Sequence, residues 1–283
     1  MPEALVPHDY LPLVRAALAE DIGRGDATTL ALVPEDSYST VVMVAREPMV
    51  MAGVDLVLAS FQELDERIDF GIEVLDGQDG DFFQPLLRLQ GPTQALLTAE
   101  RTALNFVQRL SGVATLTAQF VKQVAGTEVQ ILDTRKTTPG WRALEKYAVA
   151  CGGGTNHRIG LFDQVMIKDN HLAALEGDMA EAIRRAREKY PDLKVEAEAD
   201  TIEQAQTAAE AGADIILLDN MSCGDLRQAI ELIDGRAETE ASGGVTLETV
   251  REIAETGVDF ISVGALTHSA PSVDIALDFD QLS

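Results

Sequence analysis

Beyond residue 125, the sequence alternates short apolar runs with longer amphipathic stretches, which is the pattern of strand and helix repeated in turn. The predicted strands end near Asp133, Ile167, Ala197, Leu218, Ala241 and Val263. Successive ends are 34, 30, 21, 23 and 22 residues apart, about the length of one strand–helix unit in an α/β barrel. We therefore predict that this half of the chain is an α/β barrel, with its functional groups at the C-terminal ends of the strands.

The first hundred residues have a different pattern of predicted helices and strands. Helices are predicted over 9–20 and 54–66. Strands are predicted at 40–46, 70–75 and 92–97. Residues 98–125 have the apolar face of a long helix or a helix pair. The predicted organisation is a small α+β domain at 1–105, which the C-terminal tail could rejoin, and a catalytic barrel domain at 106–283.

The charge balance is strongly acidic, with 47 Asp and Glu against 22 Lys and Arg and a formal net charge of −25. Nucleic acid and anionic membrane surfaces are excluded as partners, because binding to phosphate needs a basic face. Lysine is scarce, with 6 residues against 16 arginines. An acidic, lysine-poor surface favours a protein kept soluble in concentrated salt, and hence a halophilic source; an ordinary acidic protein is the alternative.

The N-terminal residues read as an acidic helix rather than a signal peptide, and no apolar run approaches the roughly 18 residues of a membrane span. We expect a cytoplasmic protein. The two cysteines, Cys151 and Cys223, form no CxxC pair and cannot by themselves build a disulfide framework or a zinc site. Cys151 has no evident partner base and is interpreted as a small buried residue, not a nucleophile.

Basic residues gather where the first two predicted strands end. The window from 135 to 168 holds about twice as many as the composition predicts: Arg135, Lys136, Arg142, Lys146, Arg158 and Lys168. Arginine suits bidentate recognition of carboxylate or phosphate, and lysine acts as a point charge, so the cluster predicts a pocket for a small polyanion. Pairing with the abundant carboxylates is the alternative. His157 could be a general acid or base or a hydrogen-bonding wall of the pocket, and we favour the wall.

The later predicted strands end in acidic residues or in glycines. Glu198 and Asp219 are predicted to face one cavity, where they would hold ribose hydroxyls or Mg²⁺; a polar plug at the barrel top is the alternative. Gly243-Gly244 and Gly264 follow the last two strands. Glycine loops at these places often hold a phosphate through backbone N–H groups, although tight turns use glycine as well. Together the clusters suggest an anionic base meeting a phosphorylated sugar.

A series of short strings occurs in order along almost the whole chain, from about 10 to 278. They occupy residues 20–26, 100–105, 133–140, 152–158, 167–171, 217–220, 242–244 and 263–268. Among them, Asp133-Thr134-Arg135-Lys136 and Ile167-Lys168-Asp169-Asn170 carry the basic cluster. This set resembles the signature of the quinolinate phosphoribosyltransferase family.

The resemblance implies an N-terminal α/β sandwich at 1–105 joined to an incomplete, seven-stranded α/β barrel at 106–283; six of its strands are evident from the pattern. It also implies a homodimer in which the sandwich of one subunit covers the barrel of the other. By the same resemblance, Arg101 would enter the active site of the partner.

The resemblance further implies a set of site residues. Lys136, Lys168, Glu198 and Asp219 would be catalytic, and Glu198 and Asp219 would hold Mg²⁺ together with the substrate pyrophosphate. The implied substrate-binding residues are Arg101, Thr134, Arg135, Lys136, His157, Arg158, Lys168, Glu198, Asp219, Ser242, Gly243, Gly244, Val263, Gly264, Ala265 and His268.

The implied activity is that of a pentosyl-class glycosyltransferase in NAD synthesis. It transfers a phosphoribosyl group from phosphoribosyl pyrophosphate to quinolinate, with decarboxylation, and gives nicotinate mononucleotide, pyrophosphate and CO₂. The alternatives are a nicotinate-specific enzyme or a molybdenum-operon paralogue on the same scaffold. A non-catalytic sensor of phosphorylated ligands is a third, which would not need to keep Glu198, Asp219 and Lys168 together.

Overall fold

The computed structural model describes residues 4–279, which form two compact units. The first unit contains the chain up to Ala118, then Thr138–Gly153 and the segment from Ser269 onward. The second contains Gln119–Thr137 and Gly154–His268. Both units are discontinuous in sequence, whereas the prediction divides the chain once, after residue 105. Within the described part, no helix is both long and apolar enough to cross a membrane.

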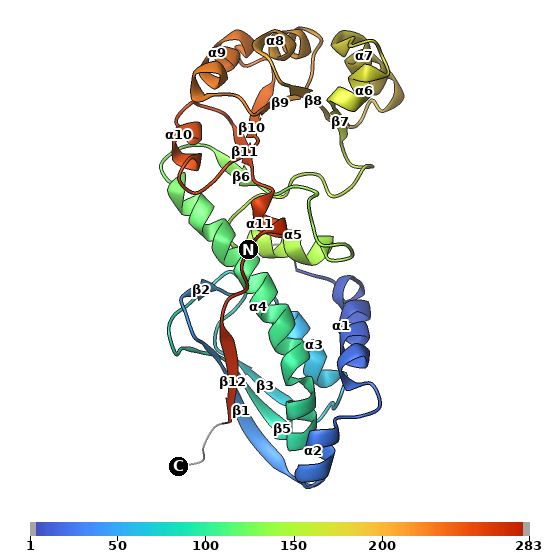
Figure 1. The fold of residues 1–283 in the computed structure, drawn as a ribbon, viewed down its shortest axis with the longest axis vertical. Helices are drawn as coiled ribbons and strands as arrows, with labels where there is room; N and C mark the ends of the chain where they lie inside the picture. The colour runs from blue at the N-terminus through green and yellow to red at the C-terminus, as the bar shows by residue number, and fades with distance from the viewer. Residues whose placement is uncertain (1–3, 280–283) are drawn as a thin grey trace. The chain divides into compact units, whose positions relative to one another are not determined.

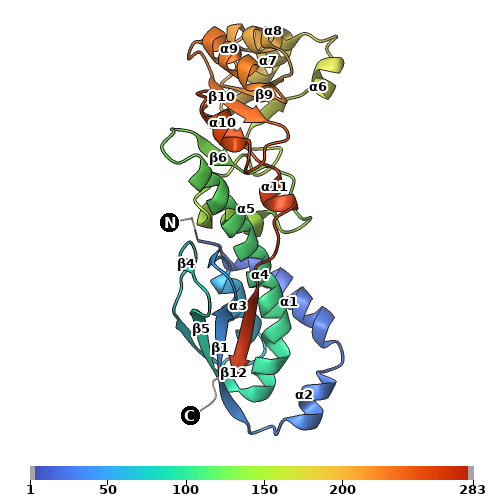
Figure 2. The same ribbon diagram turned by 60° about the vertical axis from the view of Figure 1, so that its left-hand side comes forward.

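The first unit is built on a four-stranded antiparallel sheet in the order β12-β1-β5-β3. Its strands are β1 (Tyr38–Ala45), β3 (Asp69–Ile72), β5 (Pro85–Pro92) and β12 (Ile275–Phe279), and β2 (Met49–Val50) pairs separately with β4 (Asp79–Gly80). The edge strand β12 comes from the far end of the chain and pairs with β1 (Figures 1 and 2).

Helices complete the first unit: α1 (Pro7–Ile22), α2 (Ala27–Leu32), α3 (Val54–Gln62), the first part of α4 (Thr93–Gln123) and α5 (Arg142–Cys151). Side chains of α3 and α4 pack with those of the antiparallel sheet in one hydrophobic core. Phe61 of α3 and Leu96 of α4 are fully buried there, as is Met43 of β1. The core explains the apolar face predicted for residues 98–125, because burying such a face is what holds a helix on a sheet.

The strand predicted at 92–97 is wrong. Strand β5 ends at Pro92, and α4 begins at Thr93 and continues as a single helix to Gln123. Leu96, Ala99 and Ala103 are fully buried at the three- to four-residue spacing of one helix face. Residues 94–97 are Gln, Ala and Leu, which favour helix, and they belong to the helical period that follows.

The second unit is built on a six-stranded parallel sheet in the order β6-β11-β10-β9-β8-β7. The strands are β6 (Gln130–Leu132), β7 (Val165–Ile167), β8 (Val195–Ala199), β9 (Ile215–Asp219), β10 (Glu238–Ser242) and β11 (Phe260–Ser262). All six predicted strands are confirmed, each ending within two residues of the expected position. Because the strands are parallel, their C-terminal ends lie along the same edge; Asp219, for example, lies opposite Ser242.

Helices connect these strands: α6 (Asp169–Ala173), α7 (Met179–Lys189), α8 (Ile202–Glu210), α9 (Cys223–Ile233), α10 (Val250–Ala254) and α11 (Ala265–His268). Figure 1 shows α7, α8 and α9 side by side along the outer side of the sheet. Their sheet-facing positions are small or aliphatic, as with Ala205 and Ala208 of α8, so the helices approach the strands closely.

The mixed α/β fold is confirmed, but closure of the sheet into a barrel stays an expectation. The six strands pair as an open series with β6 and β7 at its ends. The seventh strand that the resemblance implies is not among the described strands of this sheet. A single parallel bridge instead joins Leu132 to Thr155, whose N–H donates to the carbonyl of Ile131 at 2.8 Å. This bridge places the residues after Thr155 beside the end of β6.

Candidate active site

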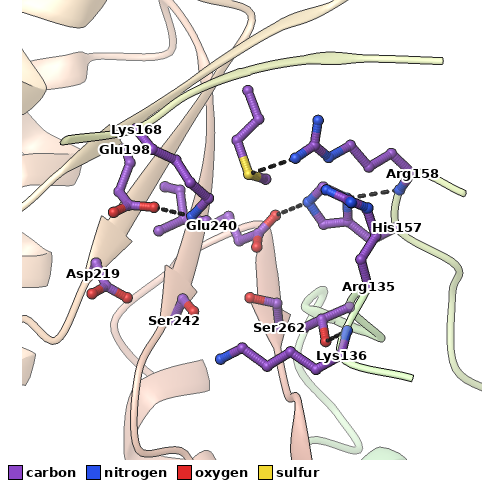
Figure 3. Close-up of a pocket in the computed structure, with 13 residues that line it drawn as sticks. Arg135, Lys136, His157, Arg158, Lys168, Glu198, Asp219, Glu240, Ser242 and Ser262 are labelled. Atoms are coloured by element: carbon purple, nitrogen blue, oxygen red, sulfur yellow. Dashed lines mark hydrogen bonds and ion pairs between the residues drawn. The ribbon is translucent and has the colours of Figure 1, made fainter. Parts of the chain in front are cut away.

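A cavity of about 420 Å³ lies at the C-terminal ends of the parallel strands, entirely within the second unit (Figure 3). It is lined by Thr134, Arg135, Lys136, His157, Arg158, Met166, Lys168, Glu198, Leu217, Asp219, Glu240, Ser242 and Ser262. Eleven of these residues lie on the six strands or in the loops that follow them, and His157 and Arg158 lie in the segment between α5 and β7. The fold therefore brings together positions that are up to 128 residues apart in sequence, from Thr134 to Ser262.

Much of the predicted site lines this cavity: Thr134, Arg135, Lys136, His157, Arg158, Lys168, Glu198, Asp219 and Ser242. Six further residues of the second unit do not line it and follow β10 and β11 directly: Gly243, Gly244, Val263, Gly264, Ala265 and His268. Arg101 is exposed on α4 in the first unit. The binding roles of these residues stay predictions.

Two arginines stand on the basic side of the cavity. The Arg158 guanidinium donates to the carbonyl of Gln164 at 3.1 Å and contacts Sδ of Met166 at 3.3 Å. Burial, and then the positive charge of Arg135, lower the pKa of Arg158 from its ordinary value. Such crowding of like charges is unfavourable until an anion binds between them, so this side of the cavity suits a carboxylate or phosphate.

His157 lines the same basic side of the cavity and lies between two buried glutamates. Its Nε2 is 3.2 Å from Glu196 and 3.3 Å from Glu240, and these carboxylates are 0% and 1% exposed. Burial by itself would lower the pKa of His157, but the hydrogen bonds and charges of the two glutamates outweigh it and raise the pKa to about 10. The backbone N–H of His157 donates to buried Asp133 at 2.9 Å, which fixes the loop after Thr155 to the end of β6.

The opposite side of the cavity is acidic. Lys168 forms an ion pair with Glu198, and Asp219 stands on the neighbouring strand (Figure 3). Oxygens of Glu198, Asp219 and exposed Asp200 lie within 4.8 Å of one another. Carboxylate oxygens are the ligands that Mg²⁺ prefers, and it is usually held by one or two of them together with substrate phosphates, so Glu198 and Asp219 fit such a site.

Two glycines that follow the last two strands pack tightly against neighbouring side chains. Gly243 has φ +96°, and a β-carbon there would lie 2.2 Å from Oδ1 of Asn220. A β-carbon on Gly264 would lie 3.0 Å from Cδ of Lys136. Gly264 therefore leaves room for the aliphatic part of the Lys136 side chain. This packing role differs from the phosphate binding predicted for Gly264, and the two roles are compatible.

The sequence interpretation missed five residues: Met166, Glu196, Leu217, Glu240 and Ser262. Each lies two positions before a residue that was predicted: Lys168, Glu198, Asp219, Ser242 and Gly264. Side chains two apart on a strand point to the same face, so extending each strand end backwards by one period would have found them. Glu196 and Glu240 were the strongest unused signal, because each is a charged residue in the interior of a predicted strand.

Cys151 behaves as interpreted from the sequence. It is buried in α5, and burial, followed by the charge of Asp76, raises the pKa of its thiol to about 12. A thiol that remains protonated at neutral pH is a poor nucleophile.

The parallel sheet with a charged cavity at its C-terminal edge defines an α/β protein whose cavity suits a small, multiply charged ligand. Two family models match the sequence: "Quinolinate phosphoribosyl transferase, N-terminal domain" over residues 26–111 and "Quinolinate phosphoribosyl transferase, C-terminal domain" over residues 113–278. The chain belongs to the quinolinate phosphoribosyltransferase family.

Relatives in bacteria and plants cover nearly the whole chain. The nicotinate-nucleotide pyrophosphorylase [carboxylating] of Mycobacterium leprae is 46% identical over 276 residues, which cover 94% of this chain and 95% of that protein. A mitochondrial quinolinate phosphoribosyltransferase [decarboxylating] of Nicotiana glauca is 42% identical, with 99% and 84% covered. The solved structure of the nicotinate-nucleotide pyrophosphorylase from Francisella tularensis matches with a TM-score of 0.93 at 39% identity, covering 98% of each chain.

Proposed function

We propose that this chain is a decarboxylating quinolinate phosphoribosyltransferase of NAD synthesis, acting in the cytoplasm. It joins quinolinate to the phosphoribosyl group of phosphoribosyl pyrophosphate and releases pyrophosphate and CO₂, leaving nicotinate mononucleotide. The observation that carries the proposal is one cavity with cations on one side and a carboxylate cluster on the other. That division suits a dianionic ring meeting an activated sugar. Relatives with these names support it over 90% or more of the chain.

The basic side would hold the pyridine dicarboxylate. Arg135 and Arg158 offer planar donors for its two carboxylates, and the His157 ring forms the wall between them and the sheet. A nicotinate ring has one carboxylate and would leave part of this positive charge unbalanced. The number of cations is therefore the feature that favours quinolinate as the substrate.

The acidic side would hold the sugar. Glu198 and Asp219 would bind ribose hydroxyls and Mg²⁺, and the loops at Gly243 and Gly264 would approach the 5′-phosphate. When bound, Mg²⁺ would neutralise the pyrophosphate and make it a better leaving group. Lys168 orients Glu198 through their ion pair, and both carboxylates favour positive charge that develops on the sugar ring.

The chemistry follows from this placement. The ring nitrogen bonds to the anomeric carbon as the pyrophosphate leaves, so the nitrogen becomes positively charged. The bond from C2 to its carboxylate then breaks, CO₂ departs, and the positive nitrogen stabilises the electron pair that stays on C2. Catalysis is mainly positional and electrostatic, because the fixed charges of the cavity need little reorganisation during the reaction.

An assay with quinolinate, phosphoribosyl pyrophosphate and Mg²⁺ tests the function. We expect equal amounts of nicotinate mononucleotide and CO₂, and little product when nicotinate replaces quinolinate. Lys136→Ala and Arg158→Ala should each lower kcat/KM by at least about 10²-fold. Lys194→Ala, which removes an exposed ion pair with Glu238, is the matched control and should retain activity. Turnover with nicotinate but not quinolinate would refute the assignment, as would near-normal activity of both cavity variants.

We also propose a homodimer in which Arg101 completes the partner's cavity. Arg101 is exposed on α4, and the cavity-lining residues all belong to the second unit. Mixing inactive Arg101→Ala with inactive Lys136→Ala subunits should restore about a quarter of wild-type activity, because half the dimers would then carry one intact site. Sedimentation should give a dimer. No recovery after verified subunit exchange would place Arg101 outside the partner's site.

A further inference from the structure

Lys136 lines the cavity although it belongs to neither a strand nor a helix. It is an exposed residue in the irregular segment 133–137, which follows β6. In Figure 3 its side chain extends past Ser262 toward Ser242, the residue that lies opposite Asp219. A lysine side chain is long and flexible, so a charge that must act at one point benefits from a fixed backbone.

Three contacts fix Lys136, each at a different part of the residue. Its backbone N–H donates to Oγ1 of Thr134 at 3.0 Å. Its carbonyl accepts a hydrogen bond from Oγ1 of Thr267 at 2.7 Å. The aliphatic part of its side chain lies against Gly264, where a β-carbon would be 3.0 Å from Cδ of the lysine. Two of these three contacts therefore come from one short segment, residues 264–267, which follows β11.

Thr267 is itself firmly held in α11. Its side chain is buried, with 0% exposure, and it does not line the cavity. Strand β11 pairs with β6, and the N–H of Val263 donates to the carbonyl of Leu132 at 2.9 Å. This pairing brings Thr267 beside Lys136, although the two are 131 positions apart in sequence. The anchor of the lysine therefore belongs to the sheet that carries the rest of the site.

The direction of the Thr267 hydroxyl is informative, because a buried threonine can satisfy its hydroxyl within its own turn. Thr256 does so: its Oγ1 donates to the carbonyl of Ile253, three residues earlier, at 2.7 Å. The corresponding distance from Thr267 to the carbonyl of Gly264 is 3.3 Å, which is long for an O–H···O hydrogen bond. The hydroxyl of Thr267 instead makes its short bond to Lys136.

We propose that Thr267 is a positioning residue, which holds Lys136 in the place that the phosphoribosyl transfer requires. The inference rests on the proposed function. Without the hydroxyl, Lys136 would still add its charge to the cavity and so support binding of the anionic substrates. It would occupy the productive position for only part of the time, so the loss should appear in kcat rather than in KM.

Thr267→Val tests the proposal, because valine removes the hydroxyl and keeps the branched shape. We expect kcat to fall about fivefold to tenfold, the usual contribution of one neutral hydrogen bond, with both KM values within about twofold of wild type. Thr267→Ser keeps the hydroxyl and should restore kcat to within about twofold. An unchanged kcat in Thr267→Val, or an equal loss in the serine variant, would overturn the proposal.

Thr256→Val is the matched control, because it makes the same substitution at a buried hydroxyl that bonds within its own turn. Thr256 precedes β11, whereas Thr267 follows it, so the control lies at the other end of that strand. Its kcat should stay within about twofold of wild type. A loss equal to that of Thr267→Val would show that removal of any buried hydroxyl near β11 slows the enzyme, and would overturn the proposal.

A double-mutant cycle with Lys136→Ala separates positioning from a general effect on the fold. If Thr267 acts through Lys136, adding Thr267→Val to Lys136→Ala should lower kcat by less than about twofold further. A second loss as large as that in the wild-type background would show that Thr267 acts independently of Lys136, and would refute the proposal.

Hydrogen exchange measures the same contact without substrates. In Thr267→Val the amides of residues 135–137 should exchange about fivefold faster than in the wild-type protein, and in Thr256→Val they should not. Unchanged exchange in Thr267→Val would show that the hydroxyl does not fix this segment, and would contradict the inference. Faster exchange in a protein whose wild type does not convert quinolinate would refute the proposed function and still support the contact with Lys136.

Discussion

The imidazole of His157 has a 7% exposed side chain and two buried carboxylates as neighbours. In the unfolded chain the ring would release its proton near its ordinary pKa of 6.5, whereas in the folded chain the pKa is about 10. The folded state therefore binds a proton that the unfolded state has lost over this interval. A difference of this kind couples folding stability to pH.

We expect wild-type protein to lose stability as pH rises from about 7 to 10. A group with a raised folded pKa contributes its full stability below the unfolded pKa, and loses it as pH passes the folded pKa. The free energy of unfolding should fall by at most about 1.4 kcal/mol per pH unit for this one proton. Urea denaturation at a series of pH values measures the slope. His157→Gln removes the titrating ring and should flatten it; an equal slope in both proteins would contradict the prediction.

At this scale the sequence was informative where charged residues sit at a strand end. Lys168, Glu198 and Asp219 were all predicted, because their types and spacing indicate chemistry without knowledge of neighbours. Glu240 was not, because a glutamate inside a strand has no meaning until the residues on either side of it in space are known. Its partner His157 lies 83 positions away in sequence.

Among the elements, the turn after β10 is tightly constrained by its surroundings. Asn220, which has φ +53°, donates its backbone N–H to the carbonyl of Ser242 at 2.8 Å and ties this turn to the end of β9. Gly243 packs on the side chain of Asn220, so the turn positions the residue next to Asp219. Gly244 has φ +59° and open space around it.

Alanine at the two glycines should therefore have unequal effects. Gly243→Ala combines a positive φ with a clash against Asn220 and should cost roughly 2–4 kcal/mol of stability, with loss of activity through displacement of Asp219. Gly244→Ala meets no neighbour and should cost about 1 kcal/mol for the left-handed backbone alone. Urea denaturation and kcat/KM measure both variants. Equal costs would show that contact with Asn220 does not constrain the turn.

The elements were predictable where the hydrophobic period extended over a whole unit. The strand ends from β6 to β11 were found because each apolar strand is followed by an amphipathic helix, and both carry their own period. The run at 92–97 was misassigned because six residues are too few to distinguish a strand from the first turns of a helix. Its assignment depends on the buried face that continues to Val107, which the core of the first unit selects.

The whole molecule carries a formal net charge of −25. Repulsion among these charges destabilises the compact state at low ionic strength, and salt shortens its range from about 8 Å at physiological strength to about 3 Å at 1 M. The halophilic source predicted from the composition stays a prediction and has a direct consequence for stability.

We expect the midpoint of thermal unfolding to rise by at least about 5 °C between 0.05 M and 2 M KCl, or roughly 2 kcal/mol for a chain of this size. Calorimetry on the same preparation measures it. Sucrose, which is excluded from protein surfaces but carries no charge, is the control and should reproduce only part of the shift. A midpoint that is unchanged or lower in KCl would contradict a salt-adapted surface.

The sequence by itself determined the order of strands and helices from residue 125 onward, the basic and acidic strand ends, and the resemblance to one family. These are local properties, because the hydrophobic period, the residue types and their spacing can be read from the sequence without knowledge of the fold. Only the tertiary structure decided that nine predicted residues share one cavity, that Gly264 makes room for Lys136, and that Glu240 lies between the two halves of the site. The reason is that strand order and register set which side chains meet, and both depend on pairings between distant segments.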